Sequence, residues 1–302
     1  MKKIRIGIVG LDTSHSIEFT RRMQAPDCPP ESKVEGMEVV TCYPFLTPFT
    51  NDEILAQRKA QLEEWGVKIV DSMEEAIADC DAIMIEINDP AYHLEYFKKV
   101  LSLNSNKPIF LDKPLAGTYE EGKQIYNLAK EHEVPLFSAS ALRYSQNLVD
   151  ASNEIPQPKQ AFIYGPLGVA PVGSGLIWYG VHCFEMLERA MGRGAVSVNV
   201  HKGEDSAVAV VSYSDKRQGI VALTVGDYFY GGTLRGNDKN ESFIVDQSKF
   251  YTELLHDVKA FFETGKAQSE PEDALEIMDL LDCAAKSYET GKAVKLNGAF
   301  KA

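Results

Sequence analysis

Two stretches of the sequence carry side chains suited to chemistry, and each directly follows an apolar run of strand length. The loop Gly10–His15 follows Ile4–Val9, and Asp112 and Lys113 follow Pro108–Leu111. A glycine that ends a strand and precedes the hydroxyl groups of a helix start is typical of a nucleotide-binding turn. A lysine at the carboxyl end of a neighbouring strand faces the same crevice. The spacing therefore predicts a small-molecule site at one edge of a sheet.

The first loop departs from the dinucleotide fingerprint Gly-x-Gly-x-x-Gly, because Asp12 and His15 stand where the second and third glycines belong. A carboxylate facing a pyrophosphate at ~4 Å costs about 4 kcal/mol at an effective dielectric of ~20, unless Asp12 turns away to cap the helix. Thr13 and Ser14 still offer donors to a phosphate. His15 either binds ligand or fills the space of the glycine. The residues expected at the nucleotide are Gly10, Leu11, Asp12, Thr13, Ser14, His15, Tyr43, Asn88, Pro90 and Asp112.

Strand and helix signals alternate over the first half of the chain, which predicts parallel βαβ crossovers and a Rossmann-type doubly wound α/β sheet. The expected strands are 4–9, 37–42, 67–70, 81–87, 108–111 and 134–139. Pro90 suits the first position of a helix, and Thr118 with Glu121 forms a capping box. Tyr43 stands where an acidic residue would hold the adenosine ribose, but its ring can still stack on adenine.

The pattern changes after about residue 150, where β-rich runs are joined by Gly, Ser and Asp turns. This predicts a second, α+β domain with a largely antiparallel sheet, and we place the two domains at 1–142 and 143–302. The expected strands are 161–164, 196–200, 207–213 and 219–225, and the expected helices are about 176–191, 251–263 and 272–288.

Composition narrows the class of partner. The 302 residues carry 31 basic and 44 acidic side chains, a formal net charge of −13, which argues against nucleic acid or an anionic membrane. No segment approaches the ~20 apolar residues of a membrane helix. Five scattered cysteines fit a reducing, cytoplasmic setting. The six histidines show no pair at ligand spacing with a cysteine or carboxylate, so no metal site is expected.

Four motifs in order resemble the glucose-fructose oxidoreductase, inositol dehydrogenase and rhizopine catabolism family, Gfo/Idh/MocA. Asp112–Ala116 is similar to the family's Glu-Lys-Pro segment, and Asn88–His93 resembles its Thr-Pro-x-x-x-His turn. Gly173–His182 resembles its Gly-rich helix start that ends in Gly-x-His, and the tail from Tyr251 through Val294 has its closing pattern. The resemblance covers nearly the whole chain.

The resemblance implies an oxidoreductase that uses NAD or NADP on a hydroxyl of a sugar, polyol or related compound. In this reading Lys113 hydrogen-bonds the reacting hydroxyl and the nicotinamide ribose, and His182 exchanges the hydroxyl proton. Trp178 stands where the family has an aspartate that pairs with this histidine, and Tyr179, Tyr144 or Asp12 is a candidate replacement. The residues expected near the substrate are Arg143, Tyr144, Trp178 and Tyr179.

Two other functions stay open at this point. The altered loop also suits a non-catalytic sugar- or nucleotide-binding protein that has lost hydride transfer, or an enzyme that keeps a tightly held cofactor for non-redox chemistry. A homo-oligomer, dimer or tetramer, is expected through the open face of the second domain's sheet. Ala207–Val211 and Ile220–Val225 are apolar enough to need a covered face.

Overall fold

The computed structural model describes residues 2–103 and 106–298, which form two compact units. Unit 1 contains the residues up to Ala139 together with Tyr251–Pro271, and unit 2 contains Ser140–Phe250 together with the residues from Glu272 on. The first boundary lies within three residues of the expected one. The two divisions differ in the segment 251–271, which belongs to unit 1 but was expected in the second domain.

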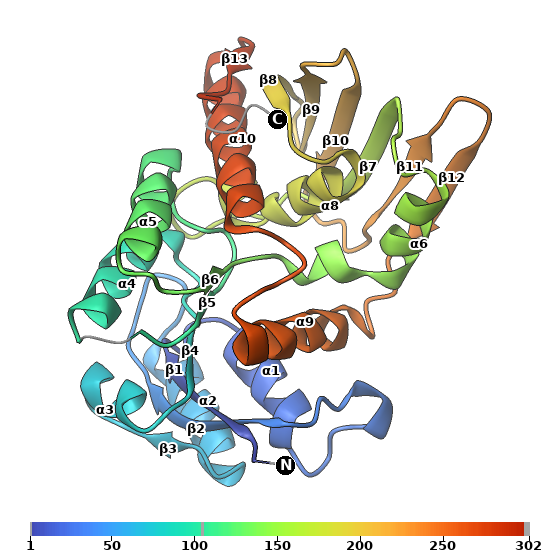
Figure 1. Ribbon diagram of the computed structural model, residues 1–302. Coiled ribbons are helices and arrows are strands. Elements are labelled where there is room, and N and C mark those ends of the chain that lie inside the picture. The colour runs from blue at the N-terminus through green and yellow to red at the C-terminus, as the bar shows by residue number, and fades with distance from the viewer. Residues whose placement is uncertain (1, 104–105, 299–302) are drawn as a thin grey trace. The chain divides into compact units, whose positions relative to one another are not determined.

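Unit 1 is built on a six-stranded, wholly parallel sheet in the order β3-β2-β1-β4-β5-β6. Figure 1 shows α4 and α5 on one side of it and α1 and α9 on the other. The order of the strands confirms the expected Rossmann-type sheet. Its strands are β1 (Ile4–Val9), β2 (Met37–Tyr43), β3 (Lys68–Ile69), β4 (Ala82–Ile85), β5 (Ile109–Leu111) and β6 (Leu136–Phe137).

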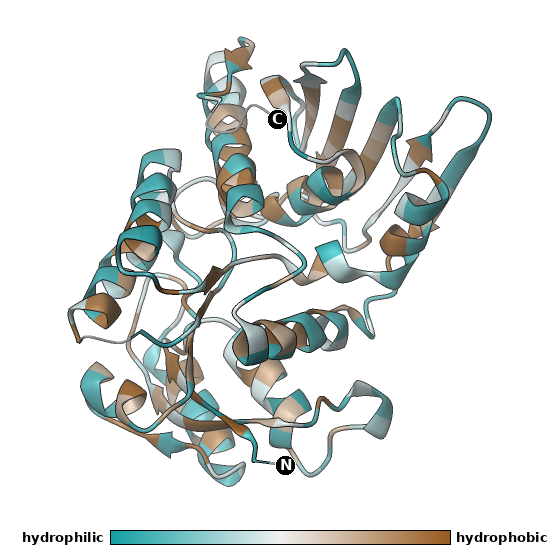
Figure 2. Ribbon diagram, in the orientation of Figure 1, coloured by the Kyte–Doolittle hydropathy of each residue, from teal (hydrophilic) through white to brown (hydrophobic). Residues whose placement is uncertain are grey.

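Apolar strands hold this sheet between its helices. Every residue of β4 and β5 is buried, and Figure 2 shows hydrophobic residues concentrated along the strands. A strand that is apolar on both faces is what a sheet covered on both sides requires. The helices of unit 1 are α1 (His15–Gln24), α2 (Asp52–Glu64), α3 (Met73–Ala78), α4 (His93–Ser102), α5 (Tyr119–Glu131) and α9 (Phe250–Thr264), with short 3-10 turns η1 (Pro30–Ser32) and η2 (Pro90–Tyr92).

Side-chain caps fix where several of these helices begin. Thr118 accepts a hydrogen bond from the Glu121 amide at 3.3 Å, which confirms the expected capping box. Asn51 and Ser72 cap α2 and α3 in the same way. Pro90 begins a single 3-10 turn, and the α-helix proper starts only at His93.

The helix α9 belongs to unit 1 because its aromatic face completes that unit's core. Phe261 is 1% exposed and its ring lies 5.5 Å from that of Phe137 on β6. Tyr251 packs edge-on against Phe19 of α1 at 5.5 Å. Thr252 donates to the carbonyl of Ser32 at 3.1 Å. These contacts lie more than a hundred residues apart in sequence, so helical periodicity alone did not reveal them.

Unit 2 contains a seven-stranded sheet in the order β12-β11-β7-β10-β9-β8-β13, in which β7 and β10 pair in parallel and the other pairs are antiparallel. This confirms the expected α+β unit. Its strands are β7 (Gln160–Pro166), β8 (Ala195–Lys202), β9 (Ser206–Tyr213), β10 (Gln218–Thr224), β11 (Gly231–Arg235), β12 (Asn240–Ile244) and β13 (Val294–Lys295). Its helices are α6 (Gln146–Glu154), α7 (Gly175–Trp178), α8 (Val181–Met191) and α10 (Pro271–Thr290), with the 3-10 turn η3 (Ala141–Tyr144).

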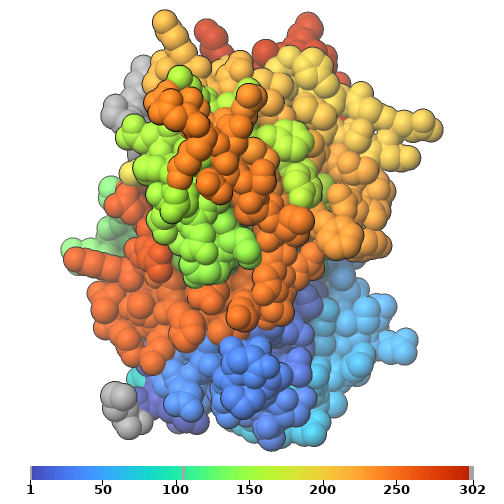
Figure 3. Space-filling model, turned by 90° about the vertical axis from the view of Figure 1, so that its right-hand side faces the viewer, coloured from blue at the N-terminus to red at the C-terminus, as the bar shows by residue number. Residues whose placement is uncertain are grey.

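The structure adds elements that the sequence pattern did not predict. Figure 3 shows α6, in green, beside the orange strands β11 and β12. These three segments are rich in polar residues, and α6 buries only Leu148 and Ala151. The helix expected over 176–191 is two helices separated by Tyr179 and Gly180, and a Cβ at Gly180 would lie 2.5 Å from the carbonyl oxygen of Leu176. Within the described ranges, no helix is both long and apolar enough to cross a bilayer.

Candidate active site

The carboxyl ends of β1, β4 and β5 meet at one edge of the unit 1 sheet, and Gly10 is the point of closest approach. Its φ is 102°, and a Cβ there would lie 2.3 Å from the carbonyl oxygen of Glu86. Both constraints exclude any other residue. Gly10 is therefore fixed by the packing of the two strands, whatever it does for a nucleotide.

Asp12 turns into the protein. Its side chain is buried, with Oδ1 accepting from the Asn88 amide at 2.8 Å and Oδ2 accepting from the Thr47 hydroxyl at 2.6 Å. Burial raises its pKa, and the hydrogen bonds from Thr47 and Asn88 oppose that effect. Asp12 thus ties the loop after β1 to the loop after β4, and it does not cap α1 as the sequence analysis had allowed.

The rest of the loop is held by its own backbone and by α2. The Leu11 carbonyl accepts from Nη1 of Arg58 at 3.0 Å, and the Thr13 hydroxyl accepts from the His15 amide at 3.2 Å. Ser14 is exposed at the start of α1. Arg58 is a residue that the sequence analysis missed, because nothing local places a side chain 47 positions away at this loop.

His15 is buried and pairs with Asp112. Its Nδ1 lies 2.8 and 3.0 Å from the two carboxylate oxygens, and Phe19 stacks on the ring at 5.2 Å. Burial disfavours the charge on Asp112, but His15 and Lys113 outweigh it and lower the pKa of this carboxyl. Where the dinucleotide fingerprint has a glycine, this chain therefore has an imidazole that hydrogen-bonds the residue after β5.

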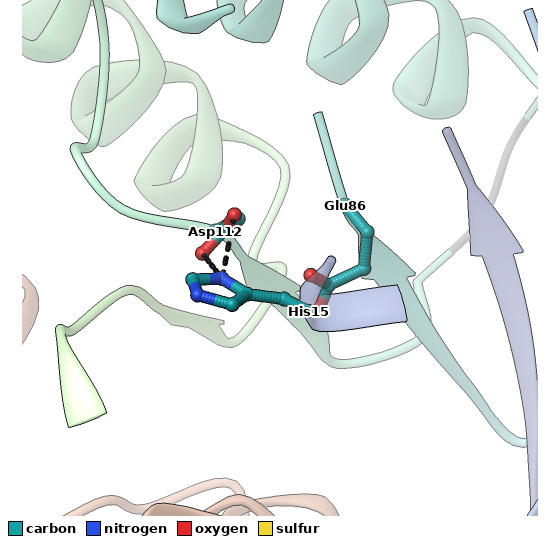
Figure 4. A group of neighbouring side chains, drawn as sticks. All are labelled: His15, Glu86 and Asp112. Carbon is teal, nitrogen blue, oxygen red and sulfur yellow. Dashed lines mark hydrogen bonds and ion pairs between the residues drawn. The ribbon is translucent and has the colours of Figure 1, made fainter. Parts of the chain in front are cut away.

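Glu86 completes this group and was not singled out from the sequence. It is fully buried, and neither of its carboxylate oxygens has a hydrogen-bond partner among the described residues. Burial first, and the Asp112 charge second, raise its pKa well above the ordinary value. One ligand atom each of His15, Glu86 and Asp112 lies within 4.8 Å of the others (Figure 4). Histidine spacing in the sequence gave no sign of this group, because its members come from three separate elements.

Lys113 lies at the same edge and is only 5% exposed. Among the described residues, nothing forms a hydrogen bond with its ammonium, whereas its backbone amide donates to Asp112 Oδ1 at 2.8 Å. The Lys113–Pro114 peptide bond is cis. A buried ammonium that acts on Asp112 and Glu86 through its charge, but has no internal hydrogen-bond partner among the described residues, is well suited to bind a ligand oxygen.

The other residues expected at the nucleotide flank this edge. Asn88 gives its amide to Asp12, and Pro90 opens η2. Tyr43, at the end of β2, contacts the ring of Phe45 at 5.8 Å, and Phe45 stacks on Tyr96 at 4.2 Å. An aromatic surface thus occupies the end of β2, where an acidic residue would otherwise be expected.

In unit 2, His182 stands in the first turn of α8. Its Nδ1 lies 2.7 Å from the Ser140 hydroxyl, and the Tyr179 ring meets the imidazole edge-on at 5.2 Å. Ser140 is thus a hydrogen-bonding partner that the sequence analysis did not name, while Tyr179 adds a ring contact. Trp178 is half-buried against Tyr179, and Tyr144 is buried in η3.

Arg143 occupies a cluster of carboxylates inside unit 2. Its guanidinium pairs with Glu188, lies 3.5 Å from Glu185 and lies 3.6 Å from Asp273. Burial disfavours its charge, but Glu188 and Glu185 more than compensate and raise its pKa. The sequence suggested a substrate contact for Arg143, whereas the structure engages this side chain with α8 and α10.

Comparison with known proteins agrees with this description. Residues 46–140 match the model of the Gfo/Idh/MocA family, described as an oxidoreductase family with an NAD-binding Rossmann fold. Two uncharacterized oxidoreductases of Schizosaccharomyces pombe are each 28% identical to this chain, over 102 and 120 residues. These matches cover 33% and 36% of the chain but only 27% and 32% of the relatives' own lengths.

Solved structures share the fold along almost the entire chain. A probable dehydrogenase from Thermotoga maritima is 17% identical with a TM-score of 0.78, covering 98% of this chain and 100% of its own. A myo-inositol dehydrogenase from Lactobacillus casei, solved with NAD(H) and myo-inositol, is 14% identical with a TM-score of 0.78, covering 99% and 98%. GenD2 from gentamicin A biosynthesis, solved with NAD, is 14% identical with a TM-score of 0.76, covering 98% and 97%. The resemblance found in the motifs is thereby confirmed: residues 46–140 match the Gfo/Idh/MocA oxidoreductase family model, and the solved structures share the fold over nearly the whole chain.

Proposed function

We propose that this protein is an NAD(P)-dependent oxidoreductase that acts on a hydroxyl of a sugar, polyol or related small molecule. The observation that carries the proposal is the ammonium of Lys113, desolvated at the carboxyl end of β5 and without a hydrogen-bond partner among the described residues. Such a group binds a hydroxyl oxygen and stabilises the negative charge that develops when the hydroxyl loses its proton. The myo-inositol in the Lactobacillus casei relative makes polyols the first substrates to test.

The residues at the sheet edge fit a dinucleotide. Asp12 is engaged by Thr47 and Asn88, so its charge does not point at a phosphate bound to the start of α1. Arg58 adds a cation beside the loop, and the backbone amides at the helix start suit an anion. The dinucleotide supplies the hydride acceptor or donor when it is bound.

The imidazole of His182 is the proposed acid–base group. Ser140 contacts the ring at Nδ1, and the imidazole is the group that we propose exchanges the proton of the substrate hydroxyl. An imidazole titrates near neutral pH and suits transfer in either direction.

Substitution of Lys113 tests the proposal. NADH and NADPH binding is first followed by nicotinamide fluorescence, and turnover is then measured with a panel of polyols including myo-inositol. Lys113→Ala is expected to lower kcat/KM by about 10²- to 10³-fold, because the alkoxide loses its cation. Lys98→Ala, in the same unit but bonded at the surface to Gln124, is the matched control and is expected to keep wild-type activity.

Two results would contradict the proposal. One is a wild-type protein that binds neither dinucleotide at millimolar concentration. The other is a protein that binds polyol and dinucleotide without turnover under any condition, which is the behaviour of a binding protein.

A further inference from the structure

We propose that His15, Glu86 and Asp112 form a binding site for a divalent transition-metal cation of the Zn²⁺ or Mn²⁺ class. The three residues come from the start of α1, the end of β4 and the end of β5. Each offers one ligand atom, and these atoms lie within 4.8 Å of one another. Ligands bound at ~2.1 Å to one ion lie up to about 4 Å apart, so small side-chain rotations suffice to close the site.

The carboxylate of Glu86 is the independent sign of a missing partner. It is 0% exposed, and neither oxygen accepts a hydrogen bond from any described residue. Buried carboxylates are normally paired, hydrogen-bonded or bound to metal. Asp12, at the same edge, makes the contrast clear, because Thr47 and Asn88 engage both of its oxygens. The Lys113 ammonium acts on Glu86 through its charge but forms no hydrogen bond with it, and a cation bound in the cluster supplies the direct partner that both oxygens lack.

The chemical types of the three ligand atoms limit which metal ions can bind. One imidazole nitrogen with two carboxylate oxygens suits Zn²⁺, Mn²⁺ and neighbouring divalent ions, and no cysteine is present to select a softer metal. The ion takes the place of the proton that His15 and Asp112 share, and that proton leaves to solvent. Phe19 and Tyr251 pack against the imidazole and hold its plane, as an apolar shell does around many metal ligands.

Cobalt is a direct probe, because the weak visible absorption of hydrated Co²⁺ shifts and strengthens when protein ligands replace its waters. The purified full chain, stripped with chelator, is titrated with Co²⁺, and Zn²⁺ and Mn²⁺ are then added as competitors. We expect one equivalent to bind, and Glu86→Gln to weaken binding at least tenfold. Asp12→Asn is the matched control, since its carboxylate is already engaged, and it is expected to bind Co²⁺ within threefold of wild type.

X-ray absorption of the Zn²⁺-loaded wild type gives a readout that needs no variant to fold. The expected spectrum has nitrogen and oxygen neighbours with one imidazole and no sulfur. A sulfur neighbour would assign the metal to a cysteine and overturn the proposal. It is equally overturned if the wild type binds none of the three ions at 1 mM, the result expected if Glu86 simply keeps a proton, or if folded Glu86→Gln binds Co²⁺ as tightly as wild type.

Discussion

The hydroxyl of Ser140 contacts the imidazole of His182, for which the Gfo/Idh/MocA pattern has a carboxylate partner. A carboxylate beside an imidazole raises its basicity, whereas a hydroxyl orients the ring with little effect on its charge. Ser140 also accepts the Leu142 amide at 3.2 Å, so the same oxygen begins η3 and contacts His182. One neutral side chain thus sets both the local backbone and the orientation of the proposed acid–base group.

Ser140→Ala is expected to lower kcat about 10- to 100-fold, because His182 loses a partner that holds its ring. Ser140→Thr keeps the hydroxyl and is expected to restore most of the rate. Ser140→Asp is expected to move the acid limb of the pH–rate profile to higher pH, since a carboxylate favours the charged imidazole. Ser145→Ala, at a buried serine whose hydroxyl has no partner among the described residues, is the control. Identical pH profiles for the Asp variant and wild type would count against this role.

At the level of elements, the buried Arg143 cluster joins η3, α8 and α10. The Arg143 guanidinium meets carboxylates of Glu185, Glu188 and Asp273, and the half-buried Arg193 also pairs with Asp273 at 3.3 Å, so three carboxylates share two cations. Burial raises the pKa of Glu185 to about 7, and the nearby Glu188 adds to this while Arg143 opposes it. Folding therefore favours the protonated form of this carboxyl.

This cluster predicts a stability that depends on pH. A raised pKa contributes stability that is fully present below the unfolded value, near 4.5, and is lost as the pH rises through about 7. The loss amounts to about 3.5 kcal/mol at most, at about 1.4 kcal/mol per pKa unit. Urea unfolding between pH 4.5 and 7.5 is expected to show a steeper loss for wild type than for Glu185→Gln, which mimics the protonated acid. Exposed Glu204→Gln should follow wild type, and parallel curves for all three proteins would refute the assignment.

The elements themselves were largely predictable, whereas their long-range partners were not. The apolar runs of β1, β4 and β5 and the capping box at Thr118 are local signals, and the structure confirms them. The group of His15, Glu86 and Asp112 depends on three chain segments meeting at one sheet edge, which periodicity does not encode. Polar segments such as α6 and β12 bury too few apolar side chains to produce a pattern.

At the scale of the whole molecule, one face of the unit 2 sheet remains apolar and accessible. Strand pairing aligns Ile220 with Phe162 on one side and with Val210 on the other. Phe162 is 38% exposed and its ring lies 6.2 Å from that of Tyr164. The neighbouring residue Ile163 is fully buried on the opposite face. The exposed face is therefore a candidate surface for self-association, as the sequence analysis expected.

Replacing Phe162 with glutamate tests this surface. Sedimentation velocity at micromolar concentration is expected to show an oligomer for wild type and a monomer for Phe162→Glu, because the charge would be buried in an apolar contact. Leu46→Glu, at an exposed apolar residue of unit 1, is expected to leave the assembly intact. A monomeric wild type, or an oligomer that survives Phe162→Glu, would rule this surface out.

Because α9 packs in unit 1, the core of that unit is completed only after most of unit 2 has been synthesised. Residues up to Ala139 are synthesised first. The ring contacts of Phe137 with Phe261 and of Phe19 with Tyr251 can form only after α9 has been made. Residues 140–250, which include all but one strand of the unit 2 sheet, emerge in between. All six strands of the unit 1 sheet are therefore synthesised before the unit 2 sheet begins, but the aromatic surface of unit 1 stays uncovered on the nascent chain until α9 has left the ribosome.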